Sequence, residues 1–326
     1  MTDVVATSES EATKAQDRRQ KSYRGYLYIA AATFSWGISA TLGRAAFTGR
    51  LFPGSGIRNI NPLILSQCRT TFSFLLIGLG LIPQRGWRQL RVPWPDLARI
   101  FLLGVGGVAA SNYFYYLAIQ RTNVATAIIV QYTAPVWVLL YMVARGAERP
   151  TLSKVGSMFL ALAGIGLVIG LFGSGKLQLD ALGVTAALVA AFSFAFYNIG
   201  GHSILARYDH WTVLLYTTMA ASLFWIVVNP PNRILAAHYS SSAWLFLVVF
   251  AVLSVLVPFA FYFAGLQYLQ PTNAIVVSCL EPVFSILIAA IVLHEVVRPR
   301  QALGILMVLV AIWIAQSPSR AVEPMD

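Results

Sequence analysis

Long apolar runs alternate with short segments rich in charge, proline and glycine along almost the whole chain. A helix of about 20 apolar residues is long enough to cross the ~30 Å hydrocarbon core of a bilayer. The strands of a β-barrel would alternate apolar and polar positions, so the pattern predicts helices. The breaks delimit ten predicted spans: 25–47, 61–83, 97–120, 122–144, 151–172, 181–204, 211–229, 243–268, 272–293 and 301–316.

The two halves of the chain are similar to each other. YLAIQRTNVATAIIVQYTAPV from Tyr116 aligns with FAGLQYLQPTNAIVVSCLEPV from Phe263 at a constant shift of 147 residues, which pairs Pro135 with Pro282. At a shift of 158 residues, FSW at 34–36 aligns with FSF at 192–194. A duplicated unit with an odd number of spans inserts its second copy from the opposite side, which makes an inverted repeat. We therefore predict an all-α integral membrane protein with ten transmembrane helices in two inverted five-helix repeats, an arrangement typical of secondary transporters.

This pattern divides the chain into five parts. The first repeat covers 25–172, the second covers 181–316, and 173–180 link them. Residues 1–24 are polar and of mixed charge, so we expect a disordered cytoplasmic tail, and 317–326 form a second cytoplasmic tail.

Composition and charge agree with a membrane protein. Hydrophobic residues make up 58% of the chain and charged residues 11%, against roughly 25% charged in soluble domains. The net charge of +11 comes mostly from lysine and arginine in short linkers beside the spans, a distribution that argues against nucleic-acid binding. With the amino terminus inside, thirteen of these cations fall in inner segments and seven in outer ones. Both termini are therefore predicted to be cytoplasmic.

Glu281 is the one acid among the chain's twelve that lies deep within a predicted span. A charge at this depth costs at least about 2.5 kcal/mol, so the side chain must face protein or a wet cavity. It either couples transport to protons or contacts a substrate amine, or it is a structural acid that pairs with Arg69 or caps backbone freed by Pro282. We assign Glu281, Pro135 and Pro282 to coupling or gating.

Several other polar and aromatic side chains fall within the spans. Arg69 requires a partner at its depth, and a substrate carboxylate would serve. Asn112 and Tyr116 share a helical face, one turn apart. Such groups either line a substrate pocket or join helices by hydrogen bonds. The predicted substrate-binding residues are Trp36, Arg69, Asn112, Tyr116, Gln131, Tyr197 and Asn198.

The sequence gives little support for an enzyme, a phosphate-binding loop or a metal site. Metalloprotease and hydrolase motifs are missing from the sequence, so we expect no enzyme activity and no cofactor. GLFGSGK at 170–176 imitates a phosphate-binding loop, but Leu177 stands where that loop needs serine or threonine. Cys68 and Cys279 lie in apolar runs without the spacing of a metal site. Gly166 and Gly170 form a GxxxG pattern that serves packing within the chain or, alternatively, a homodimer.

The chain resembles the EamA family of the drug/metabolite transporter superfamily. The resemblance rests on the ten spans, their duplication, Ala-Pro and Glu-Pro in the fourth and ninth spans, and the acids Glu148 and Glu295 that close them. It covers about residues 25–316. One departure is Ala134, which stands where the second repeat has Glu281.

The resemblance implies a secondary transporter in the cell (inner) membrane that exports a small metabolite by alternating access. An amino acid is the expected cargo, and a lipid-like or larger amphipathic metabolite is the alternative. The partners are then the substrate and the lipid bilayer. The resemblance also implies a pocket between the first four helices of each repeat, with the fifth and tenth at the periphery.

Overall fold

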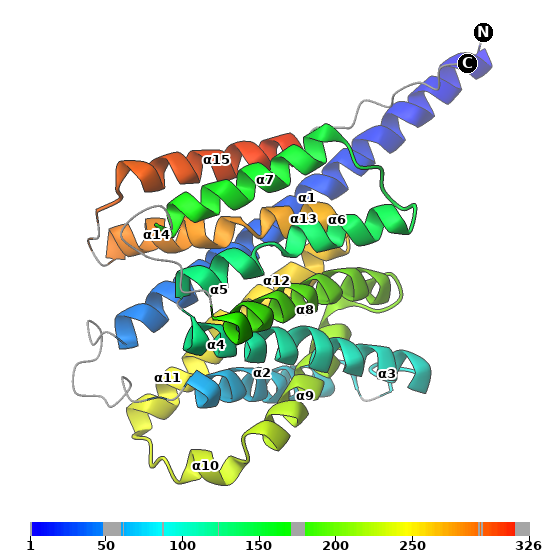
Figure 1. The fold of residues 1–326 in the computed structure, drawn as a ribbon. Helices are drawn as coiled ribbons and strands as arrows, with labels where there is room; N and C mark the ends of the chain where they lie inside the picture. The colour runs from blue at the N-terminus through cyan, green and yellow to red at the C-terminus, as the bar shows by residue number, and fades with distance from the viewer. Residues whose placement is uncertain are drawn as a thin grey trace.

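The computed structural model describes residues 2–47, 60, 62–86, 88–122, 124–170, 180–292, 294 and 296–316. These residues form helices joined by turns, with no strand among them (Figure 1). In chain order the helices are α1 (Thr2–Phe47), α2 (Pro62–Arg85), α3 (Trp94–Leu102), η2 (Leu103–Ala109), α4 (Ala110–Arg121), α5 (Val124–Gln131), α6 (Ala134–Ala144), α7 (Leu152–Val168), α8 (Ala181–Leu205), α9 (His210–Val228), α10 (Pro231–Leu235), α11 (Ser241–Ala251), η3 (Val252–Leu256), α12 (Val257–Leu266), α13 (Pro271–Val277), α14 (Leu280–Val292) and α15 (Pro299–Gln316). The segments η2 and η3 are π-helical.

Within the described residues, helix occupies all ten ranges predicted as spans. Large apolar side chains such as Leu79 and Ile291, 73% and 75% exposed, lie on the outer surface, where lipid rather than water is their favourable solvent. Leu152–Val168 and Pro299–Ala315 are apolar but shorter than a full span. In the part of the chain that the structure describes, seven stretches are long and apolar enough to cross a membrane, which makes this a multi-pass membrane protein: Leu63–Arg85, Trp94–Arg121, Thr126–Ala144, Ala181–Leu205, His210–Val228, Ser241–Leu266 and Pro271–Val292.

The first helix is longer than the sequence predicted. Residues 2–24, expected to form a disordered tail, belong to α1, and Figure 1 shows this part of α1 extending beyond the other helices. Residues 9–21 are rich in glutamate, alanine, lysine, glutamine and arginine, which lose little conformational freedom in a helix. Forming the first turn of a helix is unfavourable, and the apolar part of α1 provides that nucleus. The helix then only has to extend into the polar part.

The fourth and ninth predicted spans are each broken into two helices. The fourth is divided into α5 and α6, and the ninth into α13 and α14. Each break comes just before a proline, Pro135 or Pro282, whose ring nitrogen cannot donate the hydrogen bond that would continue the helix. The two breaks lie within one residue of each other after a shift of 147 residues. The duplication is therefore present in the backbone as well as in the sequence.

A second irregularity is also duplicated. The third predicted span contains the π-helical segment η2, and the same shift of 147 residues carries its range onto 250–256. The π-helical segment η3 lies inside that range, at Val252–Leu256. Such segments shift the side chains that follow them around the helix axis and occur often at functional sites.

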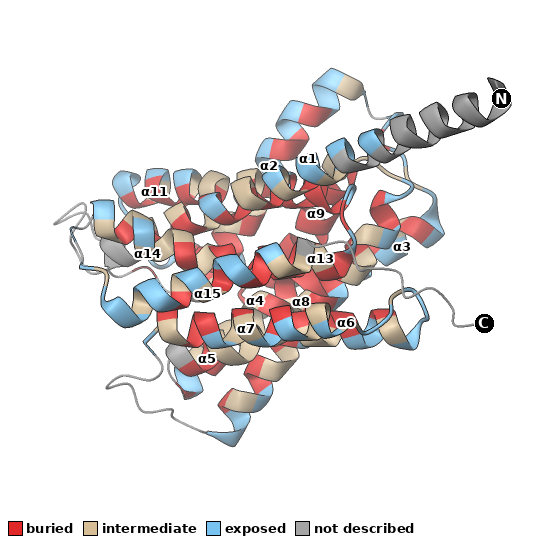
Figure 2. Ribbon diagram, turned by 90° about the horizontal axis from the view of Figure 1, so that it is seen from above, coloured by how far each residue is buried: buried red, intermediate tan, exposed pale blue. Residues whose placement is uncertain are grey.

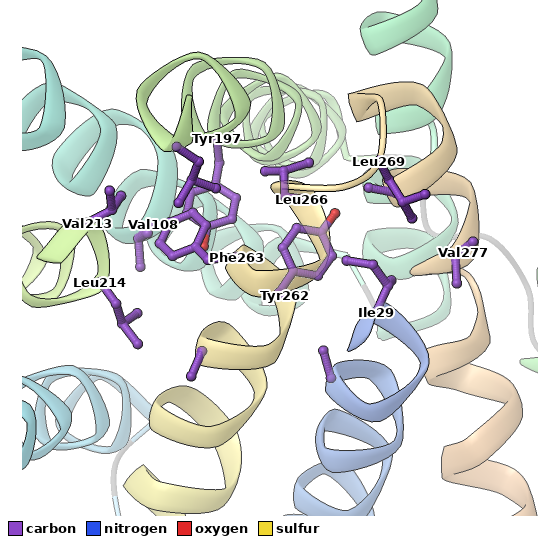
Figure 3. Close-up of a cluster of buried hydrophobic side chains, with 14 of the residues drawn as sticks. Ile29, Val108, Tyr197, Val213, Leu214, Tyr262, Phe263, Leu266, Leu269 and Val277 are labelled. Atoms are coloured by element: carbon purple, nitrogen blue, oxygen red, sulfur yellow. The ribbon is translucent and has the colours of Figure 1, made fainter. Parts of the chain in front are cut away.

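The hydrophobic core is centred on α12 (Figure 3). The ring of Tyr197 on α8 lies 5.1 Å from that of Phe263 and 6.2 Å from that of Tyr262 between ring centroids. Ile29 of α1 approaches so closely that a Cβ on Gly265 would lie 2.7 Å from its side chain. Glycine on α12 thus permits the contact between the first and eighth predicted spans.

Helices α7 and α15 lie side by side at one face of the bundle (Figures 1 and 2). A Cβ on Gly164 would lie 2.8 Å from the carbonyl oxygen of Gly304, and a Cβ on Gly304 only 2.6 Å from that of Gly164. Gly170, in contrast, follows the end of α7 with a positive φ of 76° and has no atom near its Cβ position. The close contact is therefore made by Gly164, two residues before the first glycine of the predicted GxxxG pattern.

Candidate substrate site

Glu281 lies in the first turn of α14, immediately after the break in the ninth predicted span. Its Oε2 accepts a hydrogen bond of 3.1 Å from the hydroxyl of Tyr132, which lies at the corresponding break between α5 and α6. The Glu281 backbone amide donates to the carbonyl of Ser278 at 3.1 Å. An acid of the second half and a tyrosine of the first half thus connect the two broken helices.

Arg69 of α2 is held by a neutral partner. Its Nη2 donates to Oδ1 of Asn112 on α4, and Nδ2 of Asn112 donates to the carbonyl of Val108 in η2 at 2.7 Å. The amide of Asn112 therefore orients the guanidinium from the irregular third span. Among the described residues Arg69 forms no ion pair with Glu281, although the two charges lie within electrostatic range of each other.

Tyr115 of α4 completes the group. It lies within electrostatic range of both Arg69 and Glu281, and its ring centroid is 5.8 Å from that of Tyr116. All these side chains are half-buried and lie within the apolar predicted spans. We call the following residues the central polar cluster: Arg69, Asn112, Tyr115, Tyr116, Tyr132 and Glu281.

Four of these six residues were predicted as site residues from the sequence, whereas Tyr115 and Tyr132 were not. Tyr115 stands three residues after Asn112, a spacing that places it on the same side of a helix as Asn112 and Tyr116. Tyr132 stands two residues before Ala134, the counterpart of Glu281. Both spacings are visible in the sequence, but the break that directs Tyr132 toward Glu281 is a tertiary feature.

Trp36 and Gln131 lie in polar contacts outside this cluster. The indole Nε1 of Trp36 donates to the carbonyl of Ser254 in η3 at 3.2 Å, and its ring packs against Tyr262 with centroids 5.4 Å apart. Gln131 Nε2 donates to the hydroxyl of Ser111 at 3.4 Å. Trp36 therefore attaches α1 to the π-helical segment of the second half.

Tyr197 and Asn198 are buried in the packing between α8 and α12. The amide of Asn198 donates to the carbonyl of Phe194 at 2.8 Å and accepts a hydrogen bond from the hydroxyl of Tyr262. The Tyr197 hydroxyl has no hydrogen-bond partner among the described residues, and its ring stacks in the aromatic core. Asn198 therefore forms the interhelical hydrogen bond considered as the alternative to a pocket role, whereas Tyr197 contributes aromatic packing.

Charged contacts between the two halves gather at one end of the helices. Arg207, just after α8, donates from Nη1 to both carboxylate oxygens of Asp96 on α3, at 2.9 and 3.0 Å. The hydroxyl of Tyr208 donates to Asp96 Oδ2 at 2.7 Å, and Arg99 donates to Oδ1 at 3.1 Å. The hydrogen bond to this carboxylate raises the pKa of the Tyr208 phenol, because ionisation would break it.

Two further contacts join the halves at the same end. Arg85 at the end of α2 pairs with Asp209, the cap of α9, at 2.8 Å. Glu148, predicted to close the fourth span, pairs with Lys154 at 2.6 Å and accepts a hydrogen bond of 2.9 Å from Thr272 of α13. Glu295, its counterpart, lies outside the described residues.

The chain is similar to known proteins over most of its length. The model of the EamA-like transporter family matches residues 23–170 and 181–316. An uncharacterized transporter of Archaeoglobus fulgidus is 24% identical over 89% of this chain and 97% of its own length, and the uncharacterized inner membrane transporter YicL of Salmonella typhimurium is 21% identical over 91% and 96%. The threonine/homoserine exporter RhtA of Escherichia coli is 26% identical over 81% and 83%.

A solved crystal structure has a similar fold, with a TM-score of 0.67. It is 21% identical and the match covers 87% of this chain and 96% of that one. At this level of identity the likeness concerns the fold alone.

Proposed function

The chain belongs to the EamA-like transporter family of the drug/metabolite transporter superfamily, and from this membership we propose that it is a secondary transporter that exports a small metabolite. Its ten helical segments form two inverted five-helix repeats that alternate between two conformations. Both termini lie in the cytoplasm, and the membrane is the cell's inner membrane. The matched helix breaks and π-helical segments of the two halves support this arrangement.

The observation that carries the proposal is the central polar cluster. Arg69, Asn112 and Tyr132 come from the first half and Glu281 from the second, and all lie within the apolar predicted spans. Buried charges are costly in a membrane protein, and they persist where they serve ligands or ion pathways. A site shared by two related halves is accessible first from one side and then from the other when the halves change conformation.

An amino acid is the proposed cargo. RhtA, a relative over most of both chains, is a threonine/homoserine exporter. The cluster offers a cation, an anion, one amide group and three phenol groups, which suit a small polar molecule better than an acyl chain. Glu281 couples or gates the exchange because it lies between the break in the ninth predicted span and Pro282. The equivalent break of the fourth predicted span lies just before Pro135.

The test is uptake into proteoliposomes that contain the purified full chain. A labelled panel of amino acids, nucleosides and lysophospholipid is measured with and without an imposed pH gradient. We expect an amino acid to be transported, and Glu281→Gln to abolish its acceleration by the gradient while exchange continues.

The control variant is Glu281→Asp, which keeps the carboxyl group and is expected to retain the response to the gradient. Transport of lysophospholipid, uninhibited by amino acids, would replace the proposed cargo with a lipid-like one. If nothing in the panel moves with the folded chain, the proposed export function is wrong.

A further inference from the structure

Two opposite charges of the central polar cluster lie near each other without pairing. Arg69 donates to the neutral amide of Asn112, and Glu281 accepts from the neutral hydroxyl of Tyr132. Neither is satisfied by a charged partner among the described residues, although each lies within range of the other's field. A direct ion pair would need no further ligand, whereas two charges that are held apart by neutral groups are both available to a charged ligand.

Each charge also has hydrogen-bonding capacity to spare. The Nε of Arg69 is buried and has no hydrogen-bond partner among the described residues. A guanidinium carries five N–H donors in a planar fork, and a carboxylate offers about four acceptor positions. For Glu281 the described side chains fill one of these positions, through Tyr132. The cluster therefore presents unused donors at one end and unused acceptors at the other.

Resting on the proposed transport function, we infer that this cluster recognises a zwitterion, with the ligand's carboxylate at Arg69 and its ammonium group at Glu281. The planar fork of arginine binds a carboxylate through two parallel hydrogen bonds. Tyr115 lies within electrostatic range of both charges. The α-amino and α-carboxylate groups common to all amino acids supply this pair of charges.

Charge balance is what excludes other small ligands. An amine without a carboxylate would leave Arg69 uncompensated, and an acid without an amine would leave Glu281 uncompensated. Each uncompensated charge away from water carries a free-energy penalty of several kcal/mol. Only a ligand with both charges satisfies both residues together, so selectivity rests on the two charges more than on the side chain of the cargo.

The inference is tested by thermal stabilisation of the purified full chain in detergent. The probes are L-threonine, L-homoserine, L-leucine and L-phenylalanine, each compared with its amino alcohol and its N-acetyl derivative. The amino alcohol lacks the carboxylate and the N-acetyl derivative lacks the ammonium group. We expect at least one amino acid to stabilise the chain, and both of its derivatives to need at least about tenfold higher concentrations.

Two variants assign the charges to residues. Arg69→Gln should abolish the preference for the amino acid over its amino alcohol and keep the preference over the N-acetyl derivative. Glu281→Gln should give the reverse pattern. Arg99→Gln, an exposed arginine outside the cluster, is the control and should bind like the native chain.

The outcomes separate this inference from the transport proposal. If derivatives with a single charge stabilise the native chain as well as the amino acids do, the inference is overturned, whatever is transported. If proteoliposomes transport only molecules that are not zwitterions, the chain is still a transporter but the two charges do not recognise a zwitterion. Equal loss of all preferences in both variants assigns the residues a structural role.

Discussion

The hydroxyl of Tyr132 lies 3.1 Å from Oε2 of Glu281, and the two residues stand at equivalent breaks of two helices from different halves of the chain. The contact unites a residue that precedes Pro135 with one that precedes Pro282. It fixes the relative position of the two broken helices at the depth of the candidate site. A change in conformation that separates the halves must stretch or break this hydrogen bond.

Tyr132→Phe removes the donor and leaves the ring in place. We expect the variant to fold and to lose about tenfold or more in transport efficiency, because a hydrogen bond to a charged group contributes about 1.5–3 kcal/mol. The measurement is kcat/KM for the cargo in proteoliposomes. Tyr141→Phe, at an exposed tyrosine of α6, is the control and should behave like the native chain. Equal activity of the two variants would show that the Tyr132 hydroxyl is dispensable.

Asp96 holds Arg207 and Tyr208 of the other half through three hydrogen bonds of 2.7–3.0 Å. Asp96→Ala is expected to lower the melting temperature in detergent by several degrees, since it removes charge-assisted hydrogen bonds. Arg99→Gln is the matched control because the Arg99 side chain is 60% exposed and such pairs contribute about 1 kcal/mol or less. Similar melting temperatures for both variants would contradict a structural role for Asp96.

Glu148 is the more deeply buried partner of its ion pair, with 6% of the side chain exposed against 22% for Lys154. Lys154→Met leaves this carboxylate unpaired, and we expect a loss of about 3–5 kcal/mol in stability. The double variant Glu148→Gln with Lys154→Met should recover most of that loss, because the buried charge is gone. Chemical denaturation in mixed micelles measures both values. A double variant less stable than Lys154→Met would refute this account.

Asp209 caps α9 through the amides of Trp211 and Thr212 and pairs with Arg85. Partial burial alone would raise its pKa, but the hydrogen bonds from Thr212 and Arg85 and the charge of Arg85 outweigh it and hold the pKa below its ordinary value. The resulting stability is complete above the ordinary aspartate pKa of about 3.9 and is lost as the pH falls through the lower folded value.

At pH 7, Asp209→Asn should therefore have a lower melting temperature than the native chain. Near pH 3 the difference between the two melting temperatures should be smaller. Asparagine is itself a good helix cap, so the difference isolates the carboxylate charge. Asp180→Asn, at the cap of α8, is the control for loss of a capping carboxylate. A difference between native and Asp209→Asn chains that stays constant from pH 7 to pH 3 would rule out the linkage.

Gly164 and Gly304 allow α7 and α15 to touch through their backbones. Gly164→Leu must push the helices apart, and we expect a destabilisation of about 1–3 kcal/mol. Gly156→Ala on the same helix is the control, because no atom lies within 4 Å of its Cβ position and alanine favours a helix by up to about 1 kcal/mol. Opposite shifts in melting temperature are the predicted result, and a harmless Gly164→Leu would mean that this face is not tightly packed.

The sequence by itself determined the helices, their duplication and the family, because all three depend on local patterns. A sufficiently long apolar segment specifies a membrane helix wherever it occurs. Similar segments separated by a constant number of residues reveal a repeat without any knowledge of contacts. The sequence also marked Arg69, Asn112, Tyr116 and Glu281 as polar residues that an apolar span must accommodate.

Only the tertiary structure decided which of these residues meet. Arg69 and Glu281 are separated by more than 200 positions, and whether they pair directly depends on helix breaks and rotations that composition does not encode. The same packing places Tyr132 against Glu281. It also buries Tyr197 and Asn198 between α8 and α12. Partner choice inside a bundle follows from the relative placement of several helices, and no single segment contains that information.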